Sequence, residues 1–66
     1  MVYINNTAYP FKQNQTIEQL FDQLNIEIIK GMAVAINEQV ISKTNWATHT
    51  LIDNDKLLII KAAQGG

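Results

Sequence analysis

One segment of the sequence has the pattern of an amphipathic helix, and it constrains how the rest of the chain can fold. Its apolar residues recur at positions i, i+3, i+4 and i+7, which form one stripe on a helix, namely Ile17, Leu20, Phe21 and Leu24. Thr16 and Gln19 match a capping box, in which each side chain accepts a hydrogen bond from a free backbone N–H. The helix is therefore expected to begin just after Thr16 and to bury its stripe against other elements.

Extended segments are expected on both sides of this helix. Turn residues separate short β-rich runs, and a tight turn around Asn37–Glu38 is expected because Asn tolerates a positive φ. The predicted strands cover residues 2–5, 8–12, 32–37, 38–42 and 56–62. Two strands before one helix and three after it predict an α+β domain over residues 1–62, in which a mixed sheet of four to five strands wraps the helix.

The same patterns predict which side chains form the core. We expect one cluster between helix and sheet, made of Val2, Ile4, Ile17, Leu20, Phe21, Leu24, Val34, Ile36, Leu57 and Ile59. A return loop after the helix is expected to bring Ile28 or Ile29 to this cluster. Trp46 is expected to lie half-buried at the core edge, in a loop over residues 43–55 that contains a single helical turn.

Composition excludes several classes of protein. The 66 residues carry a formal charge of −1, contain no arginine, and scatter their lysines along the chain, so no nucleic-acid-binding face is expected. No apolar run approaches the roughly 18 residues of a membrane span, and no signal peptide is recognisable. Cysteine is absent, which excludes disulfides and thiolate metal sites. A cytoplasmic protein is expected.

The folded part shows no recognisable catalytic motif. His49 is the only histidine, and no cysteine or second histidine completes a metal site or a nucleophile–base pair with it. Asp53 and Asp55 have the spacing of turn residues, and the glycines form no phosphate-binding loop. We therefore expect a protein that is not an enzyme, with no metal site.

The C-terminal residues are the remaining candidate site. Ala63, Gln64, Gly65 and Gly66 lack bulk and β-branching, and would reach about 13 Å beyond the sheet at roughly 3.3 Å per residue. Such a tail can thread a narrow channel in a partner and present the carboxylate of Gly66 there. That carboxylate is inert at neutral pH and would need activation, for instance as an acyl adenylate.

A partner surface is expected beside the tail. If Leu57 and Ile59 face the helix, then Leu58 and Ile60 lie on the uncovered face of the sheet and lead into Ala62. Ala33 and Ala35 on the neighbouring strand would keep that face flat. An apolar face beside a reactive terminus predicts protein docking, against the alternatives of a self-dimer or an ordinary apolar surface.

Two stretches, residues 15–24 and 33–66, resemble the ThiS family of sulfur carriers, which have the β-grasp, or ubiquitin-like, fold. The similar features are the Ala-Ile-Asn run ending at Asn37, Trp46, His49, the sequence DNDKLLII and the closing Gly-Gly. Asn54 stands where the family commonly has Gly, and Asn tolerates the same turn. The resemblance covers essentially the whole chain.

The resemblance implies a carrier cycle in thiamine thiazole biosynthesis. A ThiF-type adenylating enzyme would use ATP and Mg²⁺ to form an acyl adenylate on Gly66, while the carrier itself binds no cofactor. Sulfur from cysteine, delivered through a cysteine desulfurase, would leave a thiocarboxylate for thiazole synthase, ThiG. The residues agree with this, because a chain without cysteine cannot hold sulfur as a side-chain persulfide.

Three alternatives remain open at the level of sequence. The small sulfur-carrier subunit of molybdopterin synthase has the same fold and ending. A β-grasp binding module would end in Gly-Gly without using it. A ubiquitin-type modifier would form isopeptide bonds.

Overall fold

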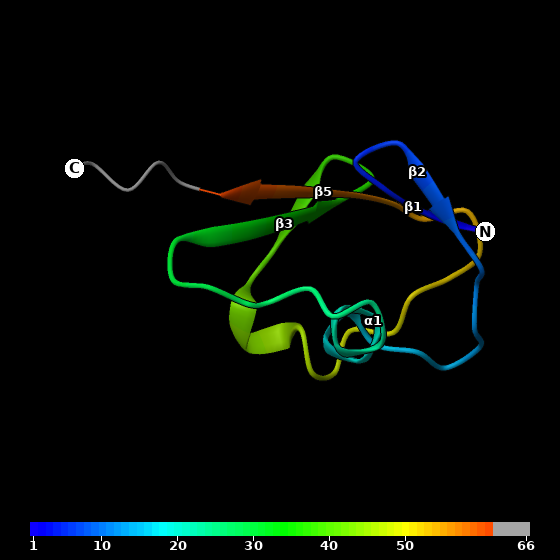
Figure 1. Ribbon diagram of the computed structural model, residues 1–66, viewed down its shortest axis with the longest axis horizontal. Helices are drawn as coiled ribbons and strands as arrows, with labels where there is room; N and C mark the ends of the chain where they lie inside the picture. The colour runs from blue at the N-terminus through cyan, green and yellow to red at the C-terminus, as the bar shows by residue number, and fades with distance from the viewer. Residues whose placement is uncertain (62–66) are drawn as a thin grey trace.

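The computed structural model describes residues 1–61, which form a five-stranded sheet and one helix (Figure 1). The elements in chain order are β1 (Val2–Ile4), β2 (Thr7–Tyr9), α1 (Ile17–Gln23), β3 (Met32–Ile36), β4 (Gln39–Ile41), the 3₁₀ turn η1 (Lys43–Asn45) and β5 (Lys56–Lys61). The predicted α+β architecture is confirmed. The predicted boundary between a domain over 1–62 and a tail over 63–66 lies outside the described residues.

The sheet joins two hairpins through its last strand. Its order is β2-β1-β5-β3-β4, so β5 lies in the centre. β5 is parallel to β1 and antiparallel to β3, whereas both hairpin pairs are antiparallel. The helix covers one face of this mixed sheet, as Figure 1 shows, and the other face has no covering element among residues 1–61.

The start of α1 is as predicted. Thr16 is the N-cap, its hydroxyl accepts a hydrogen bond from the Gln19 N–H at 3.2 Å, and the Gln19 side chain accepts one from the Thr16 N–H at 3.0 Å. Two further N–H groups of the first turn, those of Ile17 and Glu18, donate to backbone carbonyls in the segment after η1. All the N–H groups of the first helical turn therefore have acceptors.

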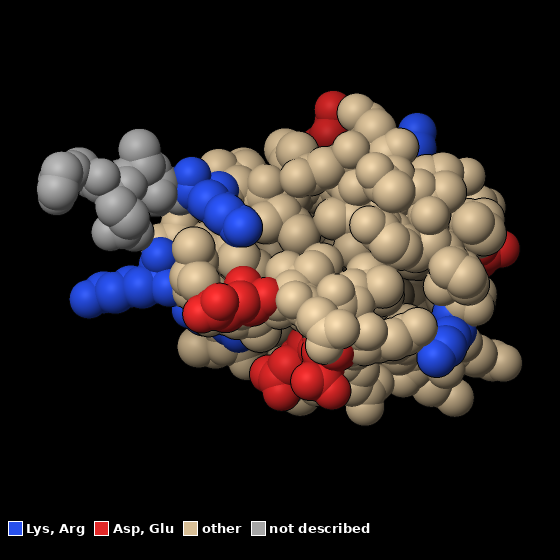
Figure 2. Space-filling model, in the orientation of Figure 1, with Lys and Arg blue, Asp and Glu red and all other residues tan. Residues whose placement is uncertain are grey.

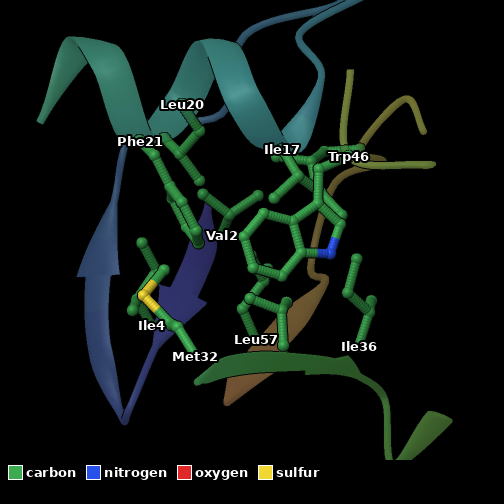
Figure 3. Packing of buried hydrophobic residues seen from close by; sticks show 11 residues of the cluster. Val2, Ile4, Ile17, Leu20, Phe21, Met32, Ile36, Trp46 and Leu57 are labelled. Atoms are coloured by element: carbon green, nitrogen blue, oxygen red, sulfur yellow. The ribbon is translucent and has the colours of Figure 1, made fainter. Parts of the chain in front are cut away.

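The core lies between α1 and the sheet (Figure 3). Eight of the ten predicted core residues are buried, while Leu24 and Ile59 are partly buried and pack against the cluster. The cluster also contains Met32, Trp46 and Leu51, which were not predicted. In the return loop Ile29 packs against the core and Ile28 is exposed. The helix stripe therefore meets alternate residues of the strands, as its spacing requires.

The prediction for Trp46 was wrong, because its side chain is only 1% exposed. Its ring meets Phe21 edge-on, with centroids 5.8 Å apart, and its Nε1 donates to the Ile41 carbonyl at 2.9 Å. The 3₁₀ turn η1 directs the ring beneath α1 (Figure 3). A loop residue thus completes the core, and its indole N–H finds a backbone partner there.

The second strand is shorter than predicted and begins earlier. The two-residue turn at Asn5 and Asn6 has positive φ at both positions and sets the pairing of Ile4 with Thr7, so β2 starts at Thr7. It ends at Tyr9, because Pro10 has no N–H to continue a ladder. The turn predicted at Asn37–Glu38 has the same geometry and is confirmed.

Candidate functional site

The residues that could have formed a catalytic site make hydrogen bonds that stabilise the fold. Asp55 is 4% exposed and accepts hydrogen bonds from the Ile52 N–H and from Asn37 Nδ2. Asp53 is exposed, and the Met1 ammonium group hydrogen-bonds to its carboxylate and lowers its pKa. The backbone carbonyl of His49 accepts a hydrogen bond from the Ile17 N–H. The two aspartates therefore hold the turn before β5 to Met1 and to Asn37.

Residues 1–61 contain no group of three or more His, Cys, Asp or Glu residues placed to hold a metal ion. In the same part of the chain, every buried polar side-chain atom has a hydrogen-bond partner. No unpaired polar group is therefore left in the described interior to recognise a small ligand.

Leu58 and Ile60 lie on the uncovered face of β5, as predicted, and the exposed Lys56 precedes them on the same face. Leu58 is 51% exposed and Ile60 is 47% exposed, while Leu57 between the helix and sheet is buried. The register places Ala35 beside Leu58 and Ala33 beside Ile60 on the same face. Small neighbours leave the two larger side chains free to contact another protein. We call the apolar residues that β3, β4 and β5 place on this face the open-face patch; they are Ala33, Ala35, Val40, Leu58 and Ile60. Ala35 is only 7% exposed, so Val40, Leu58 and Ile60 supply most of its exposed surface.

Val40 was missed by the sequence analysis. It is 70% exposed and pairs with Ala35, which continues the patch from β5 across β3 to β4. The sequence does contain a pattern that places Val40 outward, because adjacent strand residues face opposite sides of a sheet and Ile41 packs on the core. A strand of three residues gives too short an alternation to assign its faces from sequence.

Asparagine side chains in the turns after β3 and β1 hydrogen-bond to the backbone of β5, one on each side of the strand. Asn37 Oδ1 accepts from the Lys56 N–H at 3.1 Å, and Asn37 Nδ2 donates to Asp55 Oδ1 at 3.0 Å. On the other side, Asn5 Oδ1 accepts from the Ile59 N–H at 2.9 Å. These bonds fix the strand that carries Leu58 and therefore fix the orientation of the open-face patch.

The predicted tail residues lie outside the described residues. They are Ala62, predicted at the partner interface, Ala63, Gln64 and Gly65, predicted to thread a channel, and Gly66, predicted to carry the reactive carboxylate. The structure does bring together Leu58 and Ile60 on the strand that immediately precedes them. The patch residues themselves carry no ionisable group, although Lys56 and Glu38 border Leu58 and Ala35. An exposed apolar patch of this kind suits protein docking better than chemistry.

None of the helices within residues 1–61 is long and apolar enough to cross a membrane.

Comparison with known proteins gives one consistent result. Residues 2–66 match the model of the ThiS family. The chain is 32% identical over 65 residues to the sulfur carrier protein ThiS of Escherichia coli (strain K12), covering 98% of this chain and 97% of that protein. Its fold is similar to the crystal structure of the thiamine biosynthesis protein ThiS from Geobacter metallireducens, with a TM-score of 0.79, 16% identity and coverage of 98% and 97%.

Proposed function

The chain belongs to the ThiS family, and on that premise we propose that it is a sulfur carrier of thiamine biosynthesis that holds sulfur at the carboxyl group of Gly66. It acts in the cytoplasm as a carrier and cosubstrate rather than as an enzyme. Membership of this family favours thiazole formation over molybdopterin synthesis and over a binding module without carrier chemistry.

The proposed cycle has three steps. A ThiF-type adenylating enzyme uses ATP and Mg²⁺ to join AMP to the Gly66 carboxylate and releases pyrophosphate. The outer sulfur of a persulfide, which a cysteine desulfurase forms from cysteine, then attacks the acyl adenylate and displaces AMP, and a further thiol, such as that of cysteine, reduces the resulting acyl disulfide to a thiocarboxylate. Thiazole synthase, ThiG, accepts that sulfur, and the Gly66 carboxylate is regenerated for another cycle.

One structural observation carries the proposal to this chain. Leu58 and Ile60 are exposed on the strand that leads directly to the Gly-Gly sequence, so a partner that covers them is also placed to receive Gly66. The absence of cysteine supports it, because no side-chain thiol can carry the sulfur instead. The hydrogen-bonded β5 provides a rigid base for this arrangement.

Intact mass spectrometry tests the chemistry. After incubation with the ThiF-type enzyme, MgATP, a cysteine desulfurase and cysteine, the mass of the chain should rise by the difference between sulfur and oxygen. Fragmentation should place that increment on Gly66. An increment on any other residue would contradict the proposal.

Two changes in the tail distinguish the position of the carboxyl group from the passage of the tail through the partner's channel. Deleting Gly66 moves the carboxyl group by roughly 3.3 Å, which is enough to abolish adenylation because reacting atoms must approach to about 3–3.5 Å. Gly65→Val keeps the carboxyl group in place along the chain but adds a branched side chain, and should slow adenylation by obstructing the channel. Both proteins should unfold at the wild-type temperature. Thiazole formation by the deleted chain would refute the carrier role.

A double substitution tests the open-face patch. Leu58→Glu with Ile60→Glu should leave the fold intact, because both side chains are half exposed, and should weaken binding of the adenylating enzyme. Ile52→Glu is the matched control, since Ile52 is 64% exposed but lies in the loop before β5. Equal affinity of the double variant and the control, measured by calorimetry, would remove the patch from the interface.

A further inference from the structure

β5 has a free edge at the end that leads to the tail. Its pairing with β1 stops at Leu57, opposite Ile4, whereas its pairing with β3 continues to Lys61, opposite Met32. Figure 1 shows β5 and β3 running on together past the ends of β1 and β2. From Leu58 to Lys61, β5 therefore has a strand neighbour on one side only, within the part of the chain that the structure describes.

The hydrogen bonds along β5 establish which backbone groups face this edge. The carbonyls of Asp55 and Leu57 accept bonds from β1 and its turn, and the Ile59 N–H donates to the Asn5 side chain. Because the direction of backbone groups alternates along a strand, the N–H of Lys61 points to the same side. Among residues 1–61 it meets no acceptor there, since β1 has already turned away at Asn5.

A groove runs beside this edge. It has a volume of about 500 Å³, and it lies between the β1–β2 hairpin, the loop after α1 and β5. Its lining is mainly apolar or neutral and contains Ile4, Asn5, Thr7, Tyr9, Ile26, Ile59 and Lys61. Lys61 is the one charged residue in that lining, and Figure 2 shows lysine side chains around the end of the molecule where β5 finishes.

We propose that an extended segment of the adenylating enzyme adds to the free edge of β5 as a further strand, accepts a hydrogen bond from the Lys61 N–H and places a carboxylate beside the Lys61 side chain. This inference rests on the proposed function and extends it. A free strand edge supplies main-chain hydrogen bonds to an added strand, and the groove beside it receives alternate side chains. The single positive charge of the lining selects an acidic residue on the added strand.

The position of the tail selects this occupant over a second copy of the chain. Residues 62–66 continue directly from Lys61, and in the proposed cycle they enter the adenylating enzyme. That enzyme must therefore lie against the end of β5 whenever adenylation occurs. The edge and the open-face patch meet at Ile60 and Lys61, so one partner can cover both.

Amide hydrogen exchange of the wild-type protein tests the added strand directly. We expect the Lys61 amide to exchange at least about tenfold more slowly in the complex with the ThiF-type enzyme than in the free protein. The Ile60 amide points toward β3 and should be protected in both states. An unchanged exchange rate at Lys61, in a complex whose formation calorimetry has verified under the same conditions, would overturn the proposal.

A pair of substitutions isolates the backbone hydrogen bond. Lys61→Pro removes the N–H and the side-chain charge, whereas Lys61→Ala removes only the charge. Proline is tolerated where the N–H faces a free edge, so both proteins should have the wild-type unfolding temperature. The dissociation constant of the proline variant should be roughly three- to tenfold higher than that of the alanine variant, which corresponds to one interfacial hydrogen bond. Equal dissociation constants would overturn the proposal.

The two hypotheses fail in different ways. If the mass increment appears on Gly66 but the Lys61 amide exchanges freely in the complex, the carrier function stands and the added strand is wrong. If the chain binds the enzyme through this edge without ever gaining the increment, the carrier chemistry is wrong and the edge remains an interface.

Discussion

Asparagine occupies most of the positions where the backbone of this chain has a positive φ. Within residues 1–61, six of the seven such residues other than glycine are asparagines, and the seventh is Glu38. Asn tolerates this conformation because its short side chain can hydrogen-bond locally. Asn37 and Asn5 do more than turn the chain, since their side chains also accept hydrogen bonds from β5. The turns that connect the strands of the two hairpins thus also hold β5, the strand that carries Leu58 and Ile60.

Asn37→Gly tests this double role at the residue scale. Glycine keeps the positive φ but removes the side chain that bonds Asp55 and Lys56, and leaves the buried Asp55 carboxylate with one donor fewer. The free energy of unfolding should fall by about 1–3 kcal/mol. Asn6→Gly is the control, because Asn6 has a φ of 71° in the other hairpin turn and is exposed. Urea denaturation should show little change for the control, and an equal loss in both would mean that the side-chain bonds of Asn37 contribute nothing.

At the scale of elements, α1 depends on the loop packed against its start. It has only seven residues, and helices of that length are not stable alone. The Trp46 and His49 carbonyls accept hydrogen bonds from the Glu18 and Ile17 N–H groups, at 3.0 and 3.2 Å. The capping box was predictable because it consists of side chains in a local pattern. The two loop carbonyls were not, because a backbone acceptor can belong to any residue and leaves no signature in the sequence.

Thr16→Ala should destabilise the protein through this helix start. The substitution removes the acceptor of the Gln19 N–H, and the loss of an N-cap costs about 1 kcal/mol. Thr16→Ser retains the hydroxyl and should restore most of that stability. Thermal unfolding followed by circular dichroism measures both. A serine variant as unstable as the alanine variant would show that the methyl group of Thr16, and not its hydroxyl, matters.

At the scale of the whole molecule, one small core supports the sheet that carries the open-face patch. A domain of this length holds about 3–10 kcal/mol of stability. Alternation along β5 correctly predicted which of its residues face the helix and which face outward. The burial of Trp46 and the exposure of Val40 were not predicted, because both depend on how a loop and a three-residue strand meet distant segments. Neighbouring leucines of β5 therefore lie in different surroundings, with Leu57 in the core and Leu58 on the uncovered face of the sheet.

Leu20→Ala and Leu58→Ala compare these two surroundings. Leu20 is fully buried, and its truncation should lower the free energy of unfolding by about 2–5 kcal/mol, a large part of the total. Leu58 is half exposed, and the same truncation should cost well under 1 kcal/mol while weakening partner binding. Denaturant unfolding gives the first quantity and calorimetry the second. Similar losses of stability in both variants would contradict the assignment of the two faces.

The central position of β5 also has a consequence for the order of folding. Each of the hairpins β1–β2 and β3–β4 contains only local contacts and can form early, but neither is stable as two strands alone. They become one sheet only when β5 inserts between them, which brings Leu57 beside Ile4 from the far end of the described chain. During synthesis, the ribosome makes β5 after every other element of residues 1–61, so the complete sheet cannot form until this strand has been made. We therefore expect a chain interrupted before Lys56 to leave the two hairpins unjoined and to lack Leu58 and Ile60 of the open-face patch.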